Sequence, residues 1–148
     1  MVANDALLQK KAGYLNPTFF SIRAVVYFVI WSGLAHLLYK TSISQDGGHR
    51  EAHWKKMKAI SAPGMIIFAI TTTLAGFDWL MSLEPHWYST IFGVYFFSGG
   101  LWTALAVIAL VSNLLQKHGA LKSEITVEHY HDVGKLMFAF IVFWAYIA

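Results

Sequence analysis

The sequence predicts an all-α fold, a polytopic transmembrane helix bundle, and three observations support this prediction. Of the 148 residues, 57% are hydrophobic and only 13% are charged, whereas a soluble domain carries about 25% charged residues. The mean hydropathy is +0.51. Three apolar runs reach the roughly 20 residues that a helix needs to cross a bilayer core. We therefore expect three full spanning helices and a truncated fourth in a single membrane domain over residues 1–148.

The apolar runs set the order of the elements. We expect four helices, at about 19–39, 60–83, 86–115 and 135–148. Pro63 then falls in the first turn of the second helix, where proline is tolerated, and Pro85 falls near the start of the third. The fourth run has about 13 apolar residues, too few to span, so we expect the chain to be a piece of a longer protein. Residues 1–18 are expected to approach the membrane along its surface.

Basic residues are distributed unevenly between the connections. The 40–59 loop, which includes a predicted Gly47–Gly48 turn, holds five Lys or Arg residues, and the 116–134 loop with its edge holds three. The 84–87 turn holds none. Because basic loops stay on the cytoplasmic side, we expect both loops to be cytoplasmic and the 84–87 turn to face the outer compartment.

The stretch "GFDWLMSLEPHWYSTIFG" places Asp78, Glu84 and His86 within nine positions between two apolar runs. A carboxylate at the centre of a membrane helix costs roughly 2.5–3.5 kcal/mol. Two interpretations of Asp78 stay open: a carboxylate hydrogen-bonded to a neighbouring helix, or a proton-exchanging group reached from the outer face. Glu84 either complements the positive N-terminus of the third helix or joins such a site. His86 is either an interfacial polar residue or a partner in proton transfer.

Aromatic residues surround this turn, namely Trp79, Trp87 and Tyr88. They suit the wall of a pocket for a quinol head group, in which the ring packs against them. One quinol hydroxyl would then donate to His86, and a carboxylate of Asp78 or Glu84 would accept or relay the proton. Tryptophan and tyrosine also gather at membrane interfaces for anchoring alone, so both explanations stay open.

The other polar residues favour packing over cofactor binding. The chain has no cysteine, so it holds no cysteine-ligated iron–sulfur cluster. His36 and His86 lie at opposite membrane sides, which argues against haem, and we predict no metal site. Arg23 is expected to snorkel to the surface, and Thr71, Thr72 and Thr73 are expected to bond back to helix carbonyls or to reach across helices. Small residues in the third helix, Gly93, Gly100 and Ala104, predict close helix packing.

Three stretches resemble a known family: "FDWLMSLEPHWYSTIFGVYFFSGG", "HDVGKLMFAFIVFWAYIA" and "NPTFFSIRAVVYFVIW". They look like the NrfD-like, or polysulfide-reductase membrane-anchor, subunits, and among these the quinone-binding subunit 2 type of alternative complex III. That complex is a bacterial quinol:cytochrome c oxidoreductase. The elements Phe77–Asp78–Trp79 and Pro85–His86–Trp87 are the specific part of the resemblance.

The resemblance implies a respiratory membrane subunit of the bacterial inner membrane that handles quinol or protons near the outer face. It would hold no haem or iron–sulfur cluster of its own. Its implied partners are a sister NrfD-like subunit, an iron–sulfur subunit, c-type cytochrome subunits and membrane lipid, with no nucleic acid. Two alternatives stay open, a structural scaffold subunit without its own site and a proton-conducting subunit.

Overall fold

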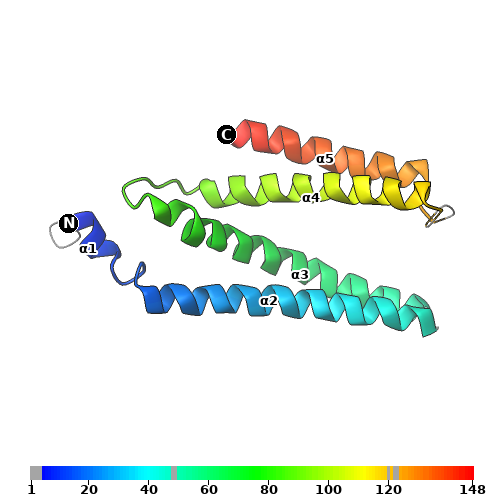
Figure 1. Ribbon diagram of the computed structural model, residues 1–148, viewed down its shortest axis with the longest axis horizontal. Coiled ribbons are helices and arrows are strands. Elements are labelled where there is room, and N and C mark those ends of the chain that lie inside the picture. The colour runs from blue at the N-terminus through cyan, green and yellow to red at the C-terminus, as the bar shows by residue number, and fades with distance from the viewer. Residues whose placement is uncertain (1–4, 48–49, 120, 122–123) are drawn as a thin grey trace. The chain divides into compact units, whose positions relative to one another are not determined.

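The computed structural model describes residues 5–47, 50–119, 121 and 124–148, and most of these residues are helical (Figure 1). The elements in chain order are α1 (Ala6–Lys11), α2 (Pro17–Ser44), the 3-10 turn η2 (Gln45–Gly47), α3 (Arg50–Trp79), the 3-10 turn η3 (Met81–Leu83), α4 (Phe92–Lys117) and α5 (Val127–Ile147). No strand occurs in the described ranges, which confirms the all-α prediction. The chain forms two compact units, Met1–Thr90 and Ile91–Ala148, and each is described by itself.

Three helices of the described ranges are long and apolar enough to cross a membrane. The candidate spans are Pro17–Gly47, Glu51–Leu83 and Phe92–Lys117, with mean hydropathies of 1.6, 1.6 and 1.9. This confirms the three predicted spanning helices. Helix α5 has 21 residues but carries Glu128, Asp132 and Lys135 near its start, so it lacks a sufficiently apolar stretch.

Helix α3 begins earlier than the apolar pattern predicts. It starts at Arg50, ten residues before the expected residue 60, so much of the predicted 40–59 loop is helical. Its first turns are polar but rich in Lys, Glu, Met and Ala, which are strong helix formers. Pro63 was predicted to lie in the first turn of this helix, but it lies in the helix interior. Gly48 of the predicted turn, His49, Lys122 and residues 1–4 lie outside the described residues.

The helices after the 84–87 turn also differ from the prediction. Helix α4 starts at Phe92 and not near residue 86, which leaves Pro85 outside it. Helix α5 starts at Val127, eight residues before the expected residue 135. A capping box explains this start, because the Thr126 and His129 side chains each accept a hydrogen bond from the backbone of the other.

In the first unit, α2 and α3 pack side by side along most of their length (Figure 1). Aromatic rings fill the contact, with Trp31 and Trp79 edge to face at 5.7 Å between ring centres. The Trp31 indole Nε1 donates to Thr71 Oγ1 at 2.9 Å, and that hydroxyl bonds back to the Ile67 carbonyl at 2.8 Å. Thr71 therefore confirms both predicted alternatives, because it bonds back to its own helix and also meets a side chain of α2. Gly64 lets Leu34 approach, since a Cβ there would lie 3.2 Å from its Cδ2.

In the second unit, α4 packs against α5 (Figure 1). The rings of Tyr95 and Trp144 stack at 4.9 Å, and Ser98 is fully buried. A Cβ on Gly99 would lie 3.2 Å from the Trp144 indole nitrogen, whereas a Cβ on Gly100 would meet nothing within 4 Å. The prediction that Gly100 permits close packing is wrong within this unit, because the neighbouring Gly99 faces α5.

Candidate functional site

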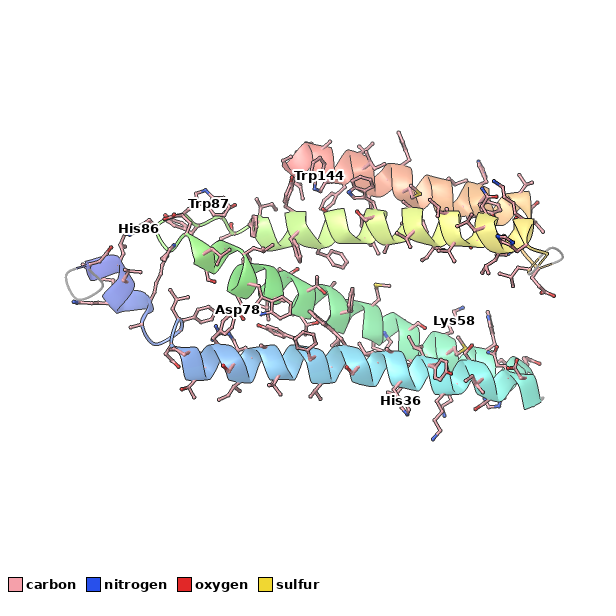
Figure 2. All side chains as sticks on the ribbon, viewed as in Figure 1. His36, Lys58, Asp78, His86, Trp87 and Trp144 are labelled. Carbon is pink, nitrogen blue, oxygen red and sulfur yellow. The ribbon has the colours of Figure 1, made fainter. Side chains whose placement is uncertain are left out.

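Asp78 accepts hydrogen bonds from three side chains of the first unit, and it lies near the end of α3 (Figure 2). Its side chain is 1% exposed. Oδ2 accepts from Arg23 Nε at 2.7 Å and from the Tyr27 hydroxyl at 2.7 Å, and Oδ1 accepts from the Tyr14 hydroxyl at 2.6 Å. Arg23 and Tyr27 are four residues apart and so share one face of α2. The carboxylate is therefore hydrogen-bonded to a neighbouring helix, the first of the two interpretations.

Arg23 lies inside the fold, and the prediction that it snorkels to the surface is wrong. Its side chain is 11% exposed. The guanidinium carbon lies 3.9 Å from the centre of the Tyr14 ring and 4.3 Å from that of Phe19, distances typical of cation–π contacts. Nη1 donates to the Tyr14 carbonyl at 3.1 Å. The reason is the buried carboxylate of Asp78, which offers the cation a stronger partner than the interface does.

The surroundings of Asp78 favour the ionised carboxylate. A buried charge is tolerated when a counter-ion and further hydrogen bonds replace its hydration, and here one guanidinium and two phenols do so. Tyr14, which precedes the α2 span, shows the reciprocal effect. Burial, and then its hydrogen bond to Asp78, raise its pKa to about 12. A carboxylate so fully paired suits a structural ion pair better than proton exchange.

His86 lies away from this cluster. Its side chain is 54% exposed, and Nε2 lies 3.0 Å from Oδ2 of Asp5. The other carboxylate oxygen of Asp5 accepts from the Leu7 backbone at 2.9 Å and so caps α1. His86 thereby connects the 84–87 turn to the N-terminal segment, and Figure 2 shows it apart from Asp78. The structure does not bring these two predicted residues together.

Glu84 also takes no part in the cluster. It is exposed, and its backbone N–H bonds to the Met81 carbonyl at 3.3 Å while its carbonyl accepts from Trp87 at 3.0 Å. Because α4 starts only at Phe92, Glu84 does not stand at the N-terminus of that helix. Its predicted electrostatic role there is wrong.

The three aromatic residues predicted as a pocket wall are dispersed. Trp79 packs into the α2–α3 contact, stacked on Phe28 at 5.7 Å between ring centres. Tyr88 is 75% exposed, with Lys11 Nζ lying 5.8 Å from its ring centre. Trp87, 48% exposed, does line a pocket. The structure does not assemble the predicted wall.

This pocket, which we call the interfacial pocket, lies between the N-terminal segment and the end of α3. Its volume is about 380 Å³. Its lining includes Lys10, Lys11, Tyr14, Phe77, Ser82 and Trp87. Sequence reasoning identified only Trp87 of these as a pocket residue, because it treated residues 1–18 as an approach segment. The one available signal was the pair of adjacent lysines close to the first span.

In the described ranges, no group of three His, Cys, Asp or Glu side chains is placed to hold a metal ion.

The helices define the structural class of this protein, and comparisons with known proteins do not narrow it to a family. With three apolar helices long enough to span, the chain belongs to the class of multi-pass helical membrane proteins. No protein-family model matches it. A 90-residue stretch is 34% identical to taste receptor type 2 member 31 of Pongo pygmaeus, covering 60% of this chain and 26% of the receptor. The chain thus spans about a quarter of that receptor's length, too little to assign it to the receptor's family.

Proposed function

We propose that this chain is a structural membrane subunit, or part of one, in a bacterial quinol:cytochrome c oxidoreductase of the alternative complex III type. The support is the resemblance of its three apolar stretches to NrfD-like subunits, together with three candidate spans. In this proposal it lies in the inner membrane, with residues 40–59 and 116–134 on the cytoplasmic side and the 84–87 turn on the periplasmic side. Its partners are a sister NrfD-like subunit, an iron–sulfur subunit and c-type cytochromes.

The structural role rests on one observation, the full pairing of Asp78. This carboxylate is 1% exposed and has a permanent counter-ion in Arg23 as well as two phenol donors. A group that exchanges protons during turnover needs a neutral state of comparable free energy. The surroundings of Asp78 stabilise the charged state alone, which favours an ion pair that fastens α2 to α3.

Quinol or proton handling is the second candidate, and the interfacial pocket favours it. Tyr14 lines this pocket and also donates to Asp78 at 2.6 Å. A quinol hydroxyl in the pocket would meet the Tyr14 oxygen and, through it, the Asp78 carboxylate. The imidazole predicted to take part, that of His86, is bonded to Asp5 instead. In this candidate function the proton of the quinol would therefore pass toward the Asp78 carboxylate without a histidine.

One experiment separates the two candidates. We would introduce Asp78→Asn into the intact complex and measure two quantities: the amount of assembled complex and the quinol-dependent cytochrome c reduction per assembled complex. The structural role predicts less complex with normal turnover. Quinol handling predicts that turnover per assembled complex falls by a factor of 10² or more, whatever amount assembles, as for loss of a proton-transfer group. Asp132→Asn, at an exposed carboxylate paired with Lys135, is the matched control.

Membership of the complex has its own test. The tagged intact protein is purified in mild detergent, and its partners are identified by mass spectrometry and by haem absorbance. We expect c-type cytochrome and iron–sulfur subunits to co-purify in equal amounts. Purification without any haem protein would remove the proposed complex while leaving the membrane class intact.

A further inference from the structure

We propose that the interfacial pocket binds an anionic phospholipid, with the lipid phosphate at Lys10 and Lys11 and the start of an acyl chain against the apolar wall. The proposal goes beyond the subunit's place in a complex and does not depend on it. Three observations carry it: the position of the pocket relative to the spans, the charge at its rim and the apolar character of its interior.

The pocket lies at the level where two of the candidate spans end. Leu15 in its wall comes just before the candidate span Pro17–Gly47, and Pro85 comes just after the end of Glu51–Leu83. The first ten of the 30 residues of α3 are mostly polar, and the remaining 20 are about 30 Å long, which matches a hydrocarbon core of about 30 Å. The end of α3 therefore lies at the level of the lipid head groups.

The rim of the pocket is positively charged. Lys11 Nζ donates to the Pro85 carbonyl at 2.5 Å and also faces the Tyr88 ring, which fixes its ammonium at the turn. Lys10, the adjacent residue, is exposed. In the described ranges neither lysine forms a salt bridge with a carboxylate, and no Asp or Glu lines the pocket. Among the described residues, the two adjacent cations therefore have no carboxylate partner in the pocket.

The interior of the pocket is largely apolar. Leu15, Phe77 and Met81 provide hydrocarbon and aromatic surface, and Trp87 adds an indole of the kind that is enriched at membrane interfaces. A phosphate diester bearing acyl chains meets both features, because its negative charge matches the two ammonium groups and its acyl chains match the apolar wall. Free phosphate would leave the apolar wall exposed to water. A neutral quinol would gain little from two ammonium groups.

The test uses the intact purified protein in detergent, titrated with dioctanoyl-phosphatidylglycerol and followed by native mass spectrometry. We expect one lipid to bind, more tightly than dioctanoyl-phosphatidylcholine. Lys10→Gln should weaken binding about 5-fold, the effect of one basic residue near a charged head group, and Lys10→Glu should weaken it further. Lys58→Gln is the matched control, because Lys58 is an exposed lysine near the opposite end of α3 (Figure 2).

Each alternative outcome overturns the proposal in a distinct way. Equal affinity for the two lipids, or equal effects of Lys10→Gln and Lys58→Gln, would show that the lysine pair selects no anion. Competition by inorganic phosphate at equal concentration would identify a phosphate site without a lipid requirement. Displacement by decylubiquinol, with no response to Lys10→Gln, would assign the pocket to quinol and would support the second candidate function.

Discussion

The Nε atom of Arg23 lies 2.7 Å from Oδ2 of Asp78, and this ion pair joins the first part of α2 to the last turn of α3. Both side chains are largely buried, at 11% and 1% exposure. The rings of Tyr14 and Phe19 cover the guanidinium. Because Tyr14 also donates to the carboxylate, the pair fastens the N-terminal segment as well as the two helices.

Loss of one partner of this pair should strongly destabilise the first unit. Arg23→Gln or Asp78→Asn leaves a buried charge without its counter-ion, which costs about 3–5 kcal/mol in the free energy of unfolding. The double variant Arg23→Met with Asp78→Leu should lose less than the sum of the single variants, because no charge remains buried. Unfolding in mild detergent, followed by tryptophan fluorescence, measures these values.

The control for this prediction is the exposed pair of Glu51 and Lys55, at 82% and 68% exposure. Glu51→Gln should change the free energy of unfolding by no more than about 0.5 kcal/mol, as for exposed pairs four residues apart on a helix. If the single variants at Arg23 and Asp78 are no less stable than Glu51→Gln, the buried pair does not fasten the helices.

Tyr14 gives a prediction about alkaline pH. Burial, followed by its hydrogen bond to Asp78, raises the pKa of Tyr14 to about 12 in the fold, against about 10 in the unfolded chain. Below pH 10 the phenol is protonated in both states, and its contribution to stability is complete. That contribution is lost as the pH rises from 10 to 12. Tyr14→Phe should therefore flatten the fall in stability over this range.

Spectrophotometric titration checks the same group directly. The difference between the tyrosinate absorbance curves of the native protein and of Tyr14→Phe should have its midpoint near pH 12. Tyr88→Phe, at a ring that is 75% exposed, serves as the control. A midpoint near pH 10 for the Tyr14 difference would mean that this phenol is not buried against Asp78.

The spanning helices were predictable because about 20 consecutive apolar residues leave few alternatives in a membrane protein. Their ends were not. The first turns of α3, from Arg50, and of α5, from Val127, are polar helical segments that hydropathy cannot distinguish from loops. The capping box of Thr126 and His129 was a local signal for the start of α5, although histidine replaces the usual Glu or Gln of that motif.

The candidate site was predictable only in part. Asp78 stood out as a carboxylate in an apolar run, and one of its two interpretations is the observed one. Its partner Arg23 carried a usable signal, since one acid and one base lie near the same end of two successive spans. The phenols of Tyr14 and Tyr27 carried none, because the approach of Tyr27 depends on the rotation of α2 against α3, and that of Tyr14 on how the segment before α2 folds back. No pattern within a single helix specifies that rotation.

The hydrogen bond between Trp31 and Thr71 should couple α2 to α3 inside the apolar contact. Its donor–acceptor distance is 2.9 Å. In a double-mutant cycle of Trp31→Phe and Thr71→Val, we expect a coupling free energy of about 0.6 kcal/mol, the mean for hydrogen bonds between membrane helices. Each single variant also loses other contacts, such as the ring contact of Trp31 with Trp79, and the cycle removes these terms. A coupling free energy of zero would mean that packing, and not this hydrogen bond, holds α2 and α3 together here.

Adjacent glycines in α4 should respond oppositely to the same substitution. Gly100→Ala places a methyl group in open space, so it should raise the stability of the second unit by up to about 1 kcal/mol through helix propensity.

Gly99→Ala brings a Cβ to within 3.2 Å of the Trp144 indole nitrogen and 3.4 Å of its Cδ1. The Trp144 ring is held by stacking on Tyr95 at 4.9 Å, so it must shift to make room. We expect Gly99→Ala to gain little or nothing. The larger Gly99→Val should lose about 1–3 kcal/mol through overpacking, with Gly100→Val as its control for β-branching. Thermal unfolding in detergent gives all four values, and equal stabilities for Gly99→Val and Gly100→Val would mean that Gly99 does not face α5.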